Sequence, residues 1–353
     1  MTPDPRSGCF TLAQADREAV LFPALRELTA HHYRHCAGYA RILDATGGWS
    51  DSGRGHRNLG DLPWLPVRLF KNHVLKSIPD EEVFTVVTSS GTTGQPSRVH
   101  LDRQAAAAQQ AALASVLRTA IGPRRLPMLI VDSGATVARA ATVSARRAGV
   151  LGMMAYGRDY TFLLDADGEL DRPAARAFLA AHGRAPFLVF GFTFLVWSAL
   201  AAFAAEEDLD LSQGVLVHTG GWKKLADLAV DNDEFRRHFA RFGLRRIHNF
   251  YGMAEQIGTV FLEGTRMPGL YCPDFADVVI RDPDTWREAA VGTPGLIQVV
   301  STLPRSYPGH SLLTEDLGVV HGVDDGDWPG KRFSILGRLP RAEARGCSDA
   351  VGG

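Results

Sequence analysis

The chain has 353 residues, of which 45% are hydrophobic and 22% charged, and these ordinary values exclude a chain that is disordered throughout. Lys and Arg number 38 against 39 Asp and Glu, so the net charge of -1 offers no general attraction to nucleic acid. The 4 cysteines form no Cys-x-x-Cys pair, which argues against a disulfide framework and a cysteine zinc site. The N-terminus is polar and no apolar run reaches membrane-spanning length. We therefore expect a cytoplasmic protein without nucleic-acid or membrane partners.

Hydrophobic periodicity predicts the elements in chain order. Apolar residues at helical spacing predict a helix over residues 11–45, and a Gly-, Ser- and Asp-rich loop follows over residues 44–60. Further along, strand-like runs alternate with helical stretches. The expected strands are 83–88, 128–131, 187–192, 215–218 and 246–250, and the expected helices are 103–120, 137–148, 173–182, 194–205 and 223–242. This alternation predicts a largely parallel sheet with helices on both faces and ligands beyond the carboxyl ends of its strands.

After about residue 255 the pattern changes to Gly, Pro and short β-rich runs at 278–280, 296–300 and 318–320. These runs predict a smaller antiparallel β subdomain. The expected fold class is therefore α/β, with largely parallel strands flanked by helices and an antiparallel addition. The expected parts are an N-terminal helical segment (1–80), an α/β core (81–265), a β-rich subdomain (266–336) and a C-terminal tail (337–353).

A run of small polar residues lies between an expected strand and an expected helix. It reads Ser89, Ser90, Gly91, Thr92, Thr93, Gly94, followed by Gln95-Pro96-Ser97. Such a chain can turn backbone N–H groups and hydroxyls toward one concavity, and a following helix would add its positive end. No Gly-Lys-Ser/Thr follows, so this is not a Walker A loop. We expect residues 89–102 to bind phosphate.

Three later motifs follow this phosphate loop in order. Gly220 and Gly221 come directly after a strand and would let a flat ring or an acyl carbon pass close to the backbone. The second motif is Asn249-Phe250-Tyr251-Gly252-Met253-Ala254-Glu255, and the third is Leu313-Thr314-Glu315-Asp316-Leu317-Gly318 with a later Gly337-Arg338. In this order they resemble the adenylate-forming superfamily of acyl-CoA ligases, firefly-type luciferases and adenylation domains.

The resemblance implies ATP and Mg²⁺ as cofactors of the 81–265 core, with the loop at the phosphates and the two glycines beside the nucleotide. By it, Asn249, Phe250, Tyr251 and Gly252 form the adenine site, with Tyr251 against the base, and Glu255 holds Mg²⁺, which prefers oxygen ligands. Asp316 would accept hydrogen bonds from the ribose hydroxyls, and Arg338 would lie near the ribose or phosphate. Two positions depart from the family pattern. Ser97 stands where a Lys or Arg is usual, with Arg98 next, and Ala254 replaces a Thr.

Members of this superfamily usually continue after the Gly-Arg motif into a mobile domain with a catalytic lysine, whereas this sequence ends at residue 353. With the Gly-Gly-Trp-Lys-Lys stretch, residues 66–71 and the Arg-Gly-Cys-Ser around Cys347, it resembles acyl-protein synthetases (LuxE-type). These activate a fatty acid in bacterial bioluminescence and pass the acyl group through a cysteine near the C-terminus. The resemblance implies an adenylate-forming N-terminal domain without the usual C-terminal domain, with Cys347 as acyl acceptor. Lys223 or Lys224 is then the candidate adenylation cation.

The leading hypothesis is an ATP-dependent ligase that activates a carboxylic acid, fatty or otherwise hydrophobic, as acyl-AMP and transfers the acyl group to a thiol such as Cys347. Its partners would be a small-molecule carboxylic acid and an acyl-donor or acyl-acceptor protein. A second hypothesis passes the acyl group to CoA, a carrier protein or an amine. A third treats the chain as a degenerate, non-catalytic adenylation fold kept as a scaffold. The departures from the family pattern at Ser97 and Ala254 favour this hypothesis.

Overall fold

The computed structural model describes residues 9–47, 49, 55–89, 96–138, 145–221 and 230–339. Within them the α-helices are α1 Gln14–His35, α2 Ala37–Thr46, α3 Leu69–Asn72, α4 Arg103–Ile121, α5 Ala145–Met154, α6 Arg172–His182, α7 Thr193–Leu195, α8 Ala201–Glu207 and α9 Asn232–Ala240. The strands are β1 Leu65–Pro66, β2 Thr85–Thr88, β3 Arg98–Leu101, β4 Leu126–Ser133, β5 Gly157–Leu164, β6 Phe187–Phe192, β7 Gly214–Thr219, β8 Arg246–Tyr251, β9 Phe261–Glu263, β10 Leu270–Tyr271, β11 Ala276–Arg281, β12 Gly295–Ser301, β13 Ser311–Val323 and β14 Lys331–Arg338.

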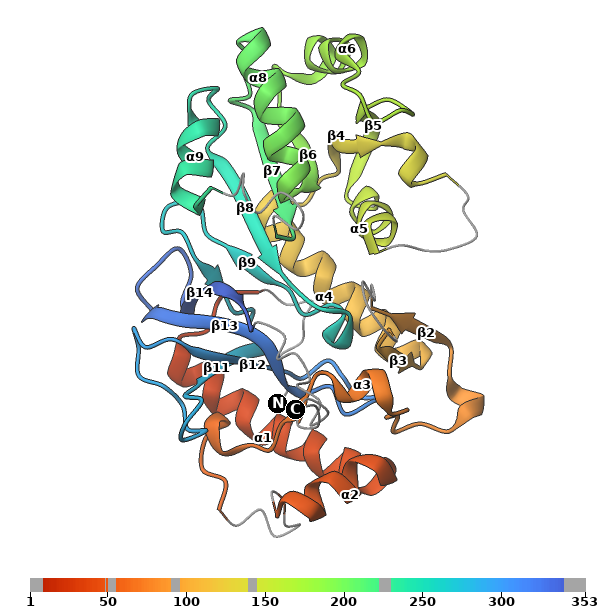
Figure 1. The fold of residues 1–353 in the computed structure, drawn as a ribbon, viewed down its shortest axis with the longest axis vertical. Helices are drawn as coiled ribbons and strands as arrows, with labels where there is room; N and C mark the ends of the chain where they lie inside the picture. Colours follow the sequence, from red (N-terminus) through yellow and green to blue (C-terminus); the bar gives the residue numbers. More distant parts are fainter. Residues whose placement is uncertain are drawn as a thin grey trace, which may run out of the picture.

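One continuous sheet contains all the described strands except β2 and β3 (Figure 1). Its first half is parallel, in the order β5-β4-β6-β7-β8. From β8 the sheet continues through the antiparallel strands β9-β10-β14-β13-β12-β11, and β1 adds to β13 in parallel. The predicted α/β class, with a parallel sheet and an antiparallel addition, is confirmed. The boundary expected at 265/266 falls between β9 and β10, which pair directly through Glu263 and Leu270.

Helices cover both faces of the parallel half of the sheet, because its central strands are apolar on both faces. In β4, Met128 and Ile130 join the core cluster that contains α4 residues, whereas Leu129 and Val131 join the cluster that contains α6, α8 and α9 residues. Successive strand residues point to opposite faces, so a strand buried on both sides is apolar at every position. This explains the uninterrupted apolar runs that the sequence shows at β4, β6 and β7.

The N-terminal helices lie at the antiparallel end, where Figure 1 shows α1 beside β11 and β12 and α2 next to α1. Leu21, Leu25 and Leu28 of α1 form a buried cluster with Val279 and Val300 of those strands. The single helix expected over residues 11–45 is wrong in one respect. Cys36 has an extended backbone (φ -127°, ψ 95°) and separates α1 from α2.

The phosphate loop has a different setting from the one predicted. β2 pairs only with β3, in a two-stranded antiparallel sheet, so the loop joins two strands of a hairpin rather than a strand and a helix. α4 begins after β3, and its N-terminus is capped by the side chain of Asp102, which accepts a 2.6 Å hydrogen bond from the Ala105 N–H. The positive end of α4 therefore already faces a carboxylate of the same chain.

Candidate active site

The carboxyl ends of β7 and β8 bring the glycine pair and the aromatic motif together. Thr219 and Phe250 are register partners, and the Thr219 hydroxyl donates a 2.9 Å hydrogen bond to the Phe250 carbonyl. Gly220 and Gly221 follow directly on one strand, as Tyr251 does on the other. Gly220 has a φ of +83°, and a Cβ there would lie 3.3 Å from the Phe192 ring. A glycine is thus required both for the turn and for the close approach.

Tyr251, Asp316 and Arg338, which the family resemblance assigns to one nucleotide, form one cluster. The Tyr251 phenol donates a 2.7 Å hydrogen bond to Asp316 Oδ2. Asp316 and Arg338 are register partners in β13 and β14, with Arg338 Nε 3.8 Å from Asp316 Oδ1. Burial and the charge of Asp316 raise the pKa of Tyr251 well above its ordinary value, so the phenol stays a hydrogen-bond donor.

The backbone before Asp316 is fixed by the buried side chain of Thr314. Its hydroxyl donates to the Ile297 carbonyl at 2.7 Å and accepts a 3.1 Å hydrogen bond from the Asp316 N–H. Asp316 therefore has a set orientation, while its two oxygens face a phenol and a guanidinium. A carboxylate held in this way can accept hydrogen bonds from a diol such as the hydroxyls of a ribose.

Glu255 lies in a short 3-10 helix, η6 (Ala254–Gln256), which packs against β3 of the hairpin. Its side chain is nearly buried (7% exposed), and within the described residues no side chain pairs with its carboxylate. The segment is held by Gln256, whose amide donates to the Gly309 carbonyl at 2.8 Å. No group of three or more His, Cys, Asp and Glu that would hold a metal exists in the described part of the chain. A nearly buried carboxylate is a hard oxygen donor, the type of ligand that Mg²⁺ prefers.

Several predicted site residues lie outside the described residues. These are Ser90, Gly91, Thr92, Thr93, Gly94, Lys223, Lys224 and Cys347. At the base of the loop the Ser89 hydroxyl accepts a 2.9 Å hydrogen bond from the Ser97 N–H. Ser97, at the position where the family has a cation, is fully buried, whereas Arg98 beside it is exposed. Arg98 is therefore an exposed cation next to Ser97.

Two features near these strand ends were not predicted from the sequence. Asp132, buried at the end of β4, receives 2.6 Å hydrogen bonds from Nε and Nη2 of Arg146. A carboxylate directly after the apolar run 128–131 is the signal that would have indicated it. The second is an ion pair between Arg68 and Glu315, with 2.6 Å between Nη2 and Oε1. These residues are 247 positions apart, and no spacing in the sequence links them.

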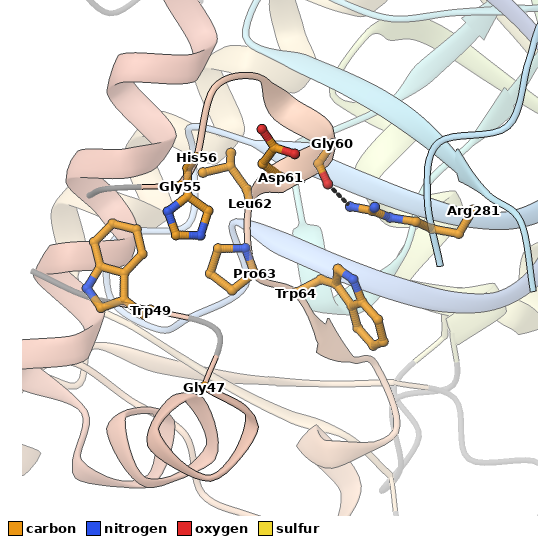
Figure 2. Close-up of a pocket in the computed structure, with 10 residues that line it drawn as sticks. All are labelled: Gly47, Trp49, Gly55, His56, Gly60, Asp61, Leu62, Pro63, Trp64 and Arg281. Carbon is orange, nitrogen blue, oxygen red and sulfur yellow. Dashed lines mark hydrogen bonds between the residues drawn. The ribbon is translucent and has the colours of Figure 1, made fainter. Parts of the chain in front are cut away.

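A cavity of about 450 Å³ lies elsewhere, near the N-terminal helices (Figure 2). Trp49, His56 and Trp64 line it together with Arg281. The Arg281 guanidinium is occupied by the Gly60 carbonyl and the Gln298 side chain, both at 2.6 Å. None of the motif residues lines this cavity, so the candidate active site is defined by the strand ends and not by this hollow.

Comparison with known proteins shows the family of this chain. The family model described as "Acyl-protein synthetase, LuxE" matches residues 6–352. The chain belongs to this acyl-protein synthetase family. It is similar to the long-chain-fatty-acid–luciferin-component ligase of Vibrio harveyi, with 26% identity over 328 residues, 90% of this chain and 83% of that protein. The ligase of the same name from Aliivibrio fischeri is 22% identical over 298 residues, 82% of this chain and 78% of that protein.

Among solved structures, an open conformation of 2-hydroxyisobutyryl-CoA ligase in complex with 2-HIB-AMP and CoA is similar. Its TM-score is 0.65 at 19% identity, covering 93% of this chain and 76% of that one. This likeness shows the fold, that of an adenylate-forming ligase domain. As an acyl-protein synthetase, the chain is an AMP-forming acid–thiol ligase, which activates a carboxylic acid as acyl-adenylate with ATP and transfers the acyl group to a thiol. The leading hypothesis is thus confirmed at that level. Among the helices that the structure describes, none has the length and apolar character needed to cross a membrane.

Proposed function

We propose that the acid is a long-chain fatty acid, that the nucleotide binds over Tyr251 and Asp316 with Mg²⁺ at Glu255, and that the acyl group is taken up by Cys347 of the same chain. The observation that carries the proposal is the cluster of Tyr251, Asp316 and Arg338 beside the glycine pair. The acid is suggested by the names of the two relatives, both long-chain-fatty-acid ligases.

In this proposal each residue of the cluster contacts a different part of the nucleotide. The Tyr251 ring packs on the base, Asp316 accepts from the ribose hydroxyls and Arg338 faces the ribose or the α-phosphate. The amides and hydroxyls of residues 89–94 surround the outer phosphates, with Arg98 beside them. When bound at Glu255, Mg²⁺ would neutralise phosphate charge that otherwise repels an attacking carboxylate. The near-burial of that carboxylate without a paired cation in the described residues supports this assignment.

The acid would approach over Gly220 and Gly221, where the backbone is uncovered. Its carboxylate oxygen attacks the α-phosphorus, the bond from that phosphorus to the bridging oxygen breaks, and pyrophosphate leaves. Lys223 or Lys224, next in the chain, is the candidate cation for this step. The apolar chain would lie along Phe192, whose ring is close to both α5 and β7. A Cβ at Gly149 or at Gly220 would lie 3.2 Å and 3.3 Å from it, respectively.

For the second step, the Cys347 thiolate attacks the acyl carbonyl carbon, AMP leaves with the bonding electrons, and a thioester remains. Arg341 and Arg345 lie close in sequence and favour the thiolate. The other three cysteines, Cys9, Cys36 and Cys272, are buried. Burial raises the pKa of Cys9 to about 11 and that of Cys272 well above its ordinary value, which makes both poor acceptors. A reducing cytoplasm would keep Cys347 available as a thiol.

The test is acylation of the whole protein with ATP, Mg²⁺ and a chain-length series of labelled fatty acids. We expect label on the wild type that hydroxylamine releases, and no label on Cys347→Ala, while Cys347→Ala still exchanges pyrophosphate into ATP. Cys9→Ala is the control and should be labelled normally. If Cys347→Ala is labelled like the wild type, the acceptor is elsewhere. Intact-mass analysis with CoA, a carrier protein or an amine then identifies the acceptor. If only short or aromatic acids react, the fatty-acid assignment is wrong.

A further inference from the structure

The carboxylate of Glu315 lies between two arginines at the edge of the nucleotide site. Arg68 Nη2 is 2.6 Å from Oε1, and Arg68 Nε donates to the same oxygen at 2.7 Å. Arg338 Nη2 donates to the other oxygen, Oε2, at 3.1 Å. Each guanidinium therefore uses a different oxygen of one carboxylate, which gives the strong, charge-assisted form of hydrogen bond. Since Arg338 is also 3.8 Å from Asp316, Glu315 connects Arg68 to the ribose motif.

The backbone around Arg68 is fixed, although its side chain is 63% exposed. β1 pairs in parallel with β13, and the Val67 N–H donates to the Leu313 carbonyl at 2.9 Å. Leu65 and Phe70, on either side of Arg68, are 0% and 1% exposed. Arg68 is thus anchored by burial of its neighbours and by the strand that carries the ribose motif. A long side chain on such a support loses less entropy when it forms an ion pair.

The charges around Glu315 also affect the proposed nucleotide site. Burial alone would raise the pKa of Glu315. The hydrogen bond from Arg68 and the charges of Arg68, Arg338 and Lys71 outweigh burial and lower it. Removing Arg68 would leave Glu315 with Arg338 as its single ion-pair partner among the described residues. Arg338 would then be drawn toward Glu315 and away from Asp316, and the patch would become more negative where ATP brings its phosphates.

We propose that Arg68 is a positioning residue of the nucleotide site, which holds Arg338 and the Asp316 ribose motif in place through Glu315. This inference rests on one part of the proposed function, namely that ATP binds at the Asp316 motif. It links residues 66–71, which the family resemblance left without a role, to the binding of the nucleotide. It predicts an effect on the apparent affinity for ATP and not on the affinity for the acid.

The test compares the full chain with Arg68→Gln, Arg68→Lys and Glu315→Gln in acid-dependent pyrophosphate exchange. We expect Arg68→Gln to raise the KM for ATP roughly threefold to tenfold with little change in kcat or in the KM for the acid. Arg68→Lys should recover part of the loss. The double variant Arg68→Gln with Glu315→Gln should have a KM for ATP no higher than that of Glu315→Gln alone, because both changes break the same connection.

The chain offers a closely matched control in Arg176→Gln. The Arg176–Glu207 pair has the same 2.6 Å separation, and its side chains are 58% and 22% exposed against 63% and 24% for Arg68 and Glu315. It joins α6 to α8, at the other end of the sheet (Figure 1). An unchanged KM for ATP in Arg68→Gln, or an equal rise in Arg176→Gln, would overturn the proposal.

A direct binding measurement separates this inference from the proposed function. If the wild type supports no exchange with any acid, the proposed function fails. ATP titration by calorimetry then still decides the role of Arg68. Weaker binding in Arg68→Gln than in Arg176→Gln supports it, and equal binding, or no ATP binding by the wild type, overturns it.

Discussion

The phenol of Tyr251 donates a 2.7 Å hydrogen bond to the carboxylate of Asp316, two residues that are 65 positions apart. Tyr251 ends the last parallel strand, β8, and Asp316 lies within β13 of the antiparallel half. The bond therefore joins the two halves of the sheet at the point where the proposed base and ribose sites meet. As a consequence, the residues proposed for the two parts of a nucleoside are held at a fixed spacing before any ligand binds.

Tyr251→Phe and Tyr251→Ala separate this hydrogen bond from the ring. Phe keeps the ring and loses the bond that orients the Asp316 carboxylate. Asp316 can still accept from the ribose hydroxyls, so we expect ATP to bind about two- to fivefold more weakly. Ala also loses the flat surface for the base, and we expect a loss of about tenfold or more. ATP titration by calorimetry measures both. Equal losses in the two variants would mean that the ring does not contact the base.

Glu255→Gln tests the proposed metal ligand. Gln keeps the size of the side chain and removes its charge, so we expect the Mg²⁺ concentration for half-maximal exchange to rise about tenfold. The free energy of unfolding should not fall, because the nearly buried carboxylate has no paired cation in the described structure. Glu206→Gln, which removes an exposed partner of Arg172, is the control. An unchanged Mg²⁺ requirement would place the metal elsewhere.

The sequence predicted the elements whose pattern is local. The strand expected at 187–192 is β6 Phe187–Phe192, and the helix expected at 103–120 is α4 Arg103–Ile121. The parallel sheet was also expected, and its neighbouring strands β7 and β8 bring the motifs at their carboxyl ends together. The family and the class of reaction, predicted from motif order, are confirmed by the family match.

The remaining features depend on contacts without a local signature. β3 has four residues, too few to show a period, so the sequence predicts a strand and a helix around the phosphate loop where the structure has a hairpin. The break at Cys36 interrupts no periodicity. The Arg68–Glu315 pair arises only because β1 adds to β13, a pairing of two residues between distant segments. Such long-range neighbours are set by how the sheet assembles and not by spacing in the chain.

Gly258 supports the Glu255 segment, and its replacement should destabilise the fold. Its φ is +84°, and a Cβ there would lie 2.4 Å from the backbone carbonyl oxygen of Gln109 in α4. We expect Gly258→Ala to lower the free energy of unfolding by about 2 kcal/mol or more. Gly152→Ala in α5 meets no atom within 4 Å and should raise it by about 0.5–1 kcal/mol. Urea unfolding measures both, and a neutral Gly258→Ala would contradict this packing.

Two buried histidines should make stability depend on pH. The rings of His32 and His310 stack with centroids 4.9 Å apart between α1 and the segment before β13. Burial lowers the pKa of His310 to about 3, and burial together with the charge of His310 lowers the pKa of His32 well below its ordinary value. In the unfolded chain both titrate near pH 6.5. Below that pH the unfolded chain binds more protons, so stability is fully present above about pH 6.5 and falls as the pH drops toward the folded pKa.

His310→Gln removes one of these titrations. Between about pH 6 and pH 4 we expect the slope of unfolding free energy against pH to decrease by about 1.4 kcal/mol per pH unit relative to the wild type. Gln can keep the hydrogen bond that the Thr29 hydroxyl makes with His310 Nε2 at 2.9 Å. Urea unfolding at several pH values gives the two slopes, and identical slopes would show that His310 is already protonated in the folded protein.

Acid activation is tested by exchange of labelled pyrophosphate into ATP by the whole protein with Mg²⁺ and a panel of carboxylic acids. Formation of an acyl-adenylate is reversible and releases pyrophosphate, so exchange must depend on the acid. We expect exchange with long-chain fatty acids, and loss of most of it in Asp316→Ala. Tight ATP binding without exchange across the whole panel would contradict acid activation and favour a non-catalytic adenylation fold.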